Sequence, residues 1–145
     1  MINAADITKS IVVILENHPD FQDVIITRSD FVNEQAERTP WIGVYRTAVE
    51  YDPATLGHHS ESWQGIISVT LLVQENSLDS GAHCESKLES LLNKTLDVLW
   101  SDPTFKASIE MVTKFRVSYL YNETEEESMY FQTAKIDITG EVRTG

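Results

Sequence analysis

The sequence has one cysteine, few basic residues and no long apolar run, and each shortage excludes a class of protein. The single cysteine, Cys84, excludes an internal disulfide and a multi-cysteine zinc site. Lys and Arg number 11 against 23 Asp and Glu, which gives a net charge of −12. That balance argues against tight binding to DNA or RNA phosphates, which needs clustered Lys and Arg, but it leaves contacts with basic proteins open.

The chain also lacks the signals of membrane insertion and secretion. It has no run of about 18 apolar residues, so we expect no membrane-spanning helix. Its first residues, MINAADITKS, lack the basic region and small-residue cleavage site of a signal peptide. A chain of 145 residues has the size of one ordinary domain and can bury roughly two-thirds of its unfolded surface. We therefore expect a soluble, cytoplasmic, acidic protein in which residues 1–145 form a single domain.

Residues 4–18 have the periodicity of an amphipathic helix. Five side chains fall on one helical face: Ile7, Ile11, Ile14, Leu15 and His18. Asn3 is the candidate N-cap, and Asp6 lies in the first turn, where a negative charge suits the helix dipole. Pro19 is expected to end the helix.

The strongest helical pattern lies between residues 78 and 100. Its apolar side chains recur at spacings of three and four: Leu88, Leu91, Leu92, Leu96, Leu99 and Trp100. Asp79 or Ser80 can cap its start, and the sequence Ser-Asp-Pro at 101–103 is expected to stop it.

Five segments have the composition or alternation of strands: 24–27, 41–47, 63–74, 115–121 and 129–142. Both faces of segment 63–74 carry apolar residues, so we expect this strand at the centre of the sheet. The order α-β-β-β-α-β-β predicts an α+β, two-layer domain. In that domain, a mainly antiparallel sheet with hairpin connections carries two amphipathic helices on one face.

Two polar segments are candidates for contact with a partner. The first, residues 51–62, joins two strong strands, and long loops of this kind tend to carry contacts. Its candidate contact residues are Tyr51, Asp52, Leu56, His58 and His59. Glu50, Asp52 and Glu61 could add oxygen ligands to the histidines. However, adjacent histidines diverge in an extended segment and the chain has no HExxH pattern, so a solvated loop is favoured over a metal site.

The second polar segment is the acid-rich turn at 122–127. Its four carboxylates are Glu123, Glu125, Glu126 and Glu127. The turn lacks the alternating oxygen ligands and central glycine of a calcium loop. It is interpreted as a solvated hairpin tip or as a negative surface that faces a channel or a basic docking partner.

No motif of catalysis is present. The chain has no Walker loop, no GxGxxG and no GxSxG, so we expect neither an enzyme nor a cofactor. His83 and Cys84 lie near the start of the second helix, where a thiol pKa can fall. A cysteine nucleophile needs a positioned base that the sequence does not indicate, and we predict a small residue packed under the helix start.

The chain resembles the tail-terminator or tail-completion proteins of long-tailed bacteriophages over about residues 40–142. Three segments carry the resemblance: PWIGVYRTAVEYDPATLG, SWQGIISVTLLVQENS before a Leu-rich helix, and the closing SYLYNETEEESMYFQTAKIDITGEV. The resemblance implies a small α+β protomer that assembles into a ring, usually of six. Such a ring caps the head-proximal end of the tail tube, ends its polymerisation and presents a surface for joining the capsid.

The resemblance also implies partners and a location. The partners would be other copies of the chain, the tail tube protein and a head–tail connector or neck protein. DNA would pass through the central channel without specific binding, and no membrane would be involved. The location would be the tail or neck of the virion, assembled in the host cytoplasm. An acidic channel would repel DNA during its passage.

Two other functions remain open from the sequence. The chain could be a different phage neck, connector or minor tail component with the same fold. It could also be a small-molecule-binding domain or an enzyme unrelated to phages, in which case a deep pocket lined by perturbed titratable groups is expected.

Overall fold

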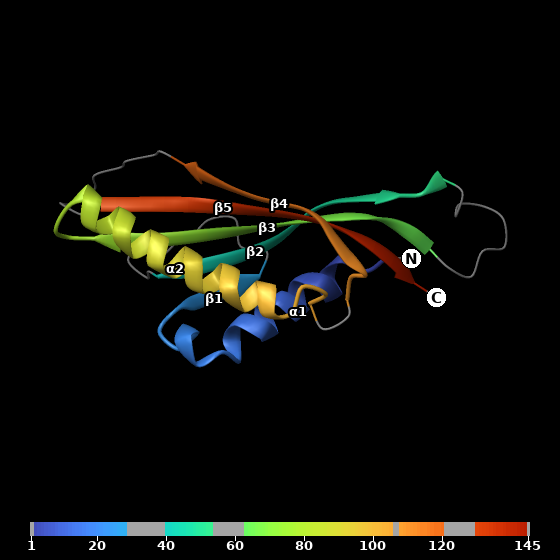
Figure 1. The fold of residues 1–145 in the computed structure, drawn as a ribbon, viewed down its shortest axis with the longest axis horizontal. Helices are drawn as coiled ribbons and strands as arrows, with labels where there is room; N and C mark the ends of the chain where they lie inside the picture. Colours follow the sequence, from blue (N-terminus) through green and yellow to red (C-terminus); the bar gives the residue numbers. More distant parts are fainter. Residues whose placement is uncertain (1, 29–39, 54–62, 106–107, 121–129, 145) are drawn as a thin grey trace.

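The computed structural model describes residues 2–28, 40–53, 63–105, 108–120 and 130–144 (Figure 1). The elements in chain order are α1 (Ala4–Glu16), the short 3₁₀ helix η1 (Pro19–Phe21), β1 (Ile25–Arg28), β2 (Trp41–Tyr51), β3 (Trp63–Ser77), α2 (Gly81–Ser101), β4 (Met111–Leu120) and β5 (Tyr130–Thr144). The predicted α+β class and the order α-β-β-β-α-β-β are confirmed. Both helices lie on the same side of the sheet in Figure 1.

The five strands form one sheet in the order β1-β2-β3-β5-β4, with β3 at the centre as predicted. Three of the strand pairs are antiparallel, whereas β1 and β2 are parallel. The expectation that hairpins join the strands is therefore wrong for this first pair. A parallel pair needs a crossover of about a dozen residues, and residues 29–40 between the two strands are numerous enough for one.

Side-chain caps fix where the two helices begin. The Asn3 side-chain oxygen accepts a hydrogen bond from the backbone N–H of Ala5 at 3.1 Å, as predicted. Ser80, rather than Asp79, caps α2, and its hydroxyl accepts from the N–H of His83 at 3.0 Å. Each cap satisfies a backbone donor that the first helical turn leaves without an intrahelical partner.

The prediction that α1 continues to His18 is wrong, because the helix ends at Glu16. His18 instead has an extended backbone and caps η1, with Nδ1 accepting from the N–H of Asp20 at 3.2 Å. The cause is Pro19, since a residue before proline is disfavoured in the helical conformation. His18 therefore does not belong to the apolar face of α1.

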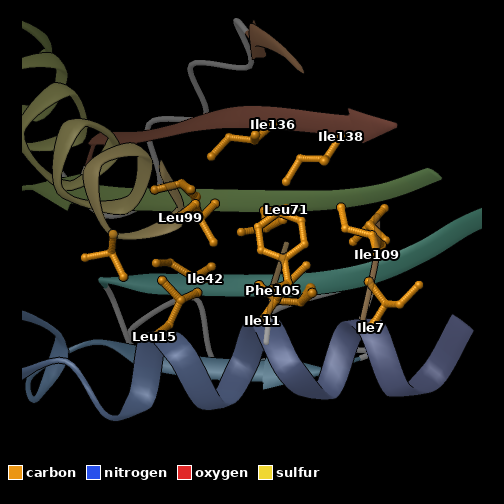
Figure 2. Packing of buried hydrophobic residues seen from close by; sticks show 14 of the residues in the cluster. Ile7, Ile11, Leu15, Ile42, Leu71, Leu99, Phe105, Ile109, Ile136 and Ile138 are labelled. Atoms are coloured by element: carbon orange, nitrogen blue, oxygen red, sulfur yellow. The ribbon is translucent and has the colours of Figure 1, made fainter. Parts of the chain in front are cut away.

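The core fills the space between the helices and one face of the sheet (Figure 2). From α1, Ile7, Ile11 and Leu15 point toward the strands, as their spacing predicts. The sheet contributes the residues of one face from three strands: Ile42, Val44, Ile67, Val69, Leu71, Val73, Ala134, Ile136 and Ile138. The alternation predicted for the strands is therefore confirmed.

The second helix packs on β3 and β5 through Leu88, Leu92 and Leu99. Trp100, which the sequence grouped with these leucines, is 72% exposed. One residue along a helix turns the side chain by about 100°, so the residue after the buried Leu99 points away from the sheet. In the part of the chain that the structure describes, no helix is long and apolar enough to cross a membrane.

Phe105 closes the core beyond the end of α2. Its backbone lies in the left-handed region, with φ at 49°, which a bulky residue rarely adopts. The ring is 2% exposed and packs in the same cluster as Ile109 and Ile11 (Figure 2). Burial of the aromatic ring offsets the backbone strain at this position.

We expect Leu92→Ala to lower the free energy of unfolding by about 2–5 kcal/mol, because Leu92 is fully buried and its loss leaves a cavity. The matched control is Trp100→Ala, which removes a larger but exposed side chain and should change stability by less than about 0.5 kcal/mol. Urea unfolding of both variants is the measurement. Equal losses would mean that α2 packs through a different face.

Candidate interaction surfaces

The structure describes only part of the predicted contact sites. Tyr51 ends β2, where it is half-buried and packs against the core, and Asp52 follows it on the surface. The backbone N–H of Asp52 donates to the carbonyl of Gln64 at 2.8 Å, which continues the β2–β3 pairing. The other predicted residues lie outside the described part of the chain: Leu56, His58, His59, Glu61, Glu123, Glu125, Glu126 and Glu127.

A wide, shallow hollow of about 400 Å³ lies beside Tyr51 and Asp52. Its lining includes four carboxylates, two from strands β2 and β5 (Glu50 and Glu141) and two from the segments after β2 and before β4 (Asp52 and Glu110). The guanidinium of Arg143 lies in the same hollow and donates from Nε to the side-chain oxygen of Gln64 at 2.8 Å. The hollow is therefore mostly negative, and a basic side chain of a partner would be attracted to it.

The described residues contain no group of three His, Cys, Asp or Glu side chains that could hold a metal ion. The hollow is also too open to enclose a small molecule, because ligand sites usually bury most of the ligand surface.

The sheet face that carries no described helix has buried aromatic residues on β2 and charged residues on β5. Trp41 and Tyr45 lie on it over Gly43, where an added Cβ would clash with both rings. Both aromatic side chains are buried, and the indole N–H of Trp41 donates to the Thr27 hydroxyl at 2.8 Å. These two aromatic residues therefore do not supply exposed surface for a partner.

Charged residues occupy the β5 part of this open face. The Thr70 hydroxyl donates to Asp137 Oδ1 at 2.7 Å, and Lys135 Nζ lies 3.7 Å from Asp137 Oδ2. Asp137 thus already has two partners within the protomer. Arg116 of β4 stands opposite Asp137 in the strand register and is exposed.

An apolar surface lies at the β4 edge of the sheet. A hollow of about 370 Å³ separates the end of α2 from the start of β4, and its lining includes Trp100, Pro103, Met111 and Phe115. We name the exposed residues along this edge the β4 flank: Trp100, Met111, Lys114, Arg116, Tyr119 and Leu120. They combine large apolar side chains with two positive charges.

Sequence reasoning missed the β4 flank because it treated this strand as half-buried and placed Trp100 in the core. A signal was nevertheless present. Residues 111–120 contain two basic residues and no acid, in a chain in which acids outnumber bases two to one. The positive charge is confined to the strand itself, because Asp137 stands opposite Arg116 and Glu110 lines the hollow together with Lys114.

Cys84 lies beneath the start of α2, as predicted, and is fully buried. Its thiol donates weak hydrogen bonds to the carbonyls of Glu75 and Tyr130, each at 3.4 Å. Burial raises the pKa of the Cys84 thiol, and the negative charge of Glu75 raises it further. A protonated, enclosed thiol is a poor nucleophile and a poor metal ligand.

Glu75 is a buried carboxylate at the end of β3, only 6% exposed. Its Oε1 atom accepts from the N–H of Asn76 at 3.2 Å and lies 3.6 Å from Lys87 Nζ. Lys87 also donates to the Asn76 carbonyl at 2.7 Å, so it ties α2 to the end of β3. This contact is structural and fixes how the helix starts over the sheet.

No protein-family model matches the chain, and no curated protein matches it.

We expect the Cys84 thiol to react with a disulfide reagent at pH 8 at least tenfold more slowly in the native protein than in urea, because it is buried and protonated. A raised folded-state pKa stabilises the protein below the unfolded thiol pKa of about 8.5, and this stability is lost as the pH rises. Stability should therefore fall more steeply between pH 8.5 and 10 in the native sequence than in Cys84→Ala. Fast native labelling would contradict the buried position.

We expect Lys87→Met to lower the free energy of unfolding by about 1–3 kcal/mol, because it leaves the buried Glu75 carboxylate without its cation while retaining the apolar stem. Lys94→Met, an exposed site on the same helix, is the control and should be neutral within about 0.5 kcal/mol. Thermal unfolding of both variants is the measurement. Equal midpoints would show that the Glu75–Lys87 contact adds nothing.

Proposed function

We propose that this chain is the subunit of a ring that caps the head-proximal end of the tail tube in a long-tailed bacteriophage. The ring ends tube polymerisation and offers its other side to the head–tail connector or neck. The resemblance of residues 40–142 to tail-terminator proteins supports this function, and the chain has the α+β fold that the resemblance implies. In this role the protein is a structural part of the virion, assembled in the host cytoplasm.

The observation that carries the proposal is the exposed β4 flank. Two helices cover one face, and the exposed β4 flank lies at the edge beyond α2. Exposed Trp100 and Met111 beside an apolar hollow are costly in water and are suited to burial against a neighbour. A self-assembling structural subunit accounts for this surface better than an enzyme does, because both hollows are shallow and open.

The charge of the chain suits a channel for DNA. Each subunit carries a net charge of −12, and a ring repeats that charge around its axis. Like-charge repulsion would keep DNA from adhering as it passes. The acid-rich turn at 122–127 and the loop at 51–62 remain the predicted contact segments, facing the channel, the tube or the connector.

We expect the purified protein to form particles several times the mass of one chain, with a central opening, either alone or on tail tubes of the phage that encodes it. Light scattering gives the mass, and electron microscopy of the protein with tubes gives the position. A strict monomer that ignores tail tubes would refute the proposal. Rings that bind the connector but not the tube end would indicate a different neck component of the same fold.

A further inference from the structure

The β4 strand forms one edge of the sheet. In the described part of the chain it pairs with β5 alone, and no described strand lies beyond it. Its register shifts between Val112 and Lys114, which is a β-bulge, so uninterrupted pairing along β4 is confined to the seven residues Lys114–Leu120. The outer side of this segment is therefore where an added strand can pair with the sheet.

The two faces of segment Lys114–Leu120 carry different side chains. Phe115, Val117 and Tyr119 point to the helix side, because they stand opposite the buried residues of β5 in the register. Phe115 and Val117 are half-buried and Tyr119 is 42% exposed, since α2 packs over β3 and β5. The open side of the sheet carries Lys114, Arg116, Ser118 and Leu120.

The two cations of the segment have acids near them within the protomer. Arg116 stands opposite Asp137 of β5, and Glu110 lines the same hollow as Lys114. Charge therefore does not select a partner for this edge. The row of aromatic and β-branched side chains on the helix side is what distinguishes it, and such side chains stabilise a sheet when they stand opposite one another on adjacent strands.

We propose that β4 of one copy pairs antiparallel with β4 of a second copy, about a two-fold axis that passes between their Val117 residues. Both copies then have their helices on the same side of one continuous sheet. Val117 stands opposite itself, and Phe115 of each copy stands opposite Tyr119 of the other. The contact goes beyond the proposed function and does not rest on it. On the open side, the cross-strand pairs are Lys114 with Leu120 and Arg116 with Ser118.

Like charges and segment length select this register. Moving the axis to Arg116 places that residue opposite its own copy, and moving it to Phe115 places Lys114 opposite Arg116. Like charges directly opposite each other destabilise a strand pair. Moving the axis to Ser118 shortens the contact, because Lys114 and Phe115 then stand beyond the end of β4 in the other copy. The Val117 register pairs all seven residues and opposes no two cations.

The apolar hollow beside β4 adds side-chain contact to the strand pairing. The hollow separates the end of α2 from the start of β4, and its lining includes Trp100, Met111 and Phe115. Tyr119 of the second copy stands opposite Phe115 in the proposed register, so its ring comes to the side of this hollow. Trp100, 72% exposed in the protomer, is then covered together with Tyr119. Aromatic side chains buried between subunits supply much of the binding free energy of an interface.

The first test is a disulfide across the proposed axis. Val117→Cys places two thiols opposite each other, at a separation close to that of a disulfide. A mild oxidant should convert most of this variant into covalent dimers on a non-reducing gel. Lys94→Cys, at an exposed site on α2, is the control for random collision and should remain monomeric. The native Cys84 is buried and should not contribute.

Two further cysteine variants test the register. Arg116→Cys and Ser118→Cys stand opposite each other in the proposed pairing, so an equimolar mixture should cross-link faster than either variant alone. Faster cross-linking of either variant with itself would place the axis at that residue and would contradict the proposal.

The last test uses lysine at two equally exposed apolar sites. Tyr119→Lys places a charge inside the proposed contact, whereas Val13→Lys changes a residue of α1 that is 38% exposed, against 42% for Tyr119. Tyr119→Lys should raise the concentration at half-association by at least about tenfold in light scattering, and Val13→Lys should leave it unchanged. Circular dichroism should show that both variants are folded.

The outcomes separate this contact from the ring function. If Val117→Cys cross-links no faster than Lys94→Cys, or if the two lysine variants associate equally well, the strand pairing is wrong, whatever the protein does at tail tubes. If Val117→Cys forms dimers but the protein neither forms rings nor binds tubes, the pairing stands and the ring function is wrong.

Discussion

The packing of the two helices on one face of the sheet, with β3 at its centre, determines the rest of the structure. Ile67, Val69, Leu71 and Val73 supply this face, and β3 is paired with a neighbour on each side. Burial of its apolar area is the main favourable free energy available to a domain without disulfides. Because α1 covers the β2 side and α2 covers the β5 side, the helices leave β4 at the uncovered edge. The exposed flank is thus a consequence of how the core is covered.

Local chemistry made much of this fold predictable. The alternation in β3 and β5 and the leucine spacing in α2 indicate which side chains face the core. Asn3 and Ser80 show where the helices begin. The sequence did not indicate in which direction strands far apart in the chain pair with each other. The parallel arrangement of β1 and β2 is such a pairing, and no residue in Ile25–Arg28 encodes a direction.

The candidate surfaces were less predictable than the fold. Trp100 continues the spacing of Leu92 and Leu96 by four residues, yet it is 72% exposed because its side chain points away from the sheet. Tyr51 was expected at a contact loop, but β2 extends to include it and its ring packs inward. Exposure depends on the tertiary neighbours of a residue, which hydrophobic spacing does not encode. Charge was the more useful signal, because the absence of acids in β4 is visible before folding.

The position of β5 between β3 and β4 links the exposed edge of the sheet to the completion of folding. Within the sheet β4 pairs with β5 alone, and β5 follows it in the chain. The β4 flank therefore cannot take its shape until β5 is synthesised and inserted beside β3. Pairing between strands that are far apart in sequence is slow, so this is a late step. A protomer in which β5 has not yet been inserted would therefore lack this exposed edge.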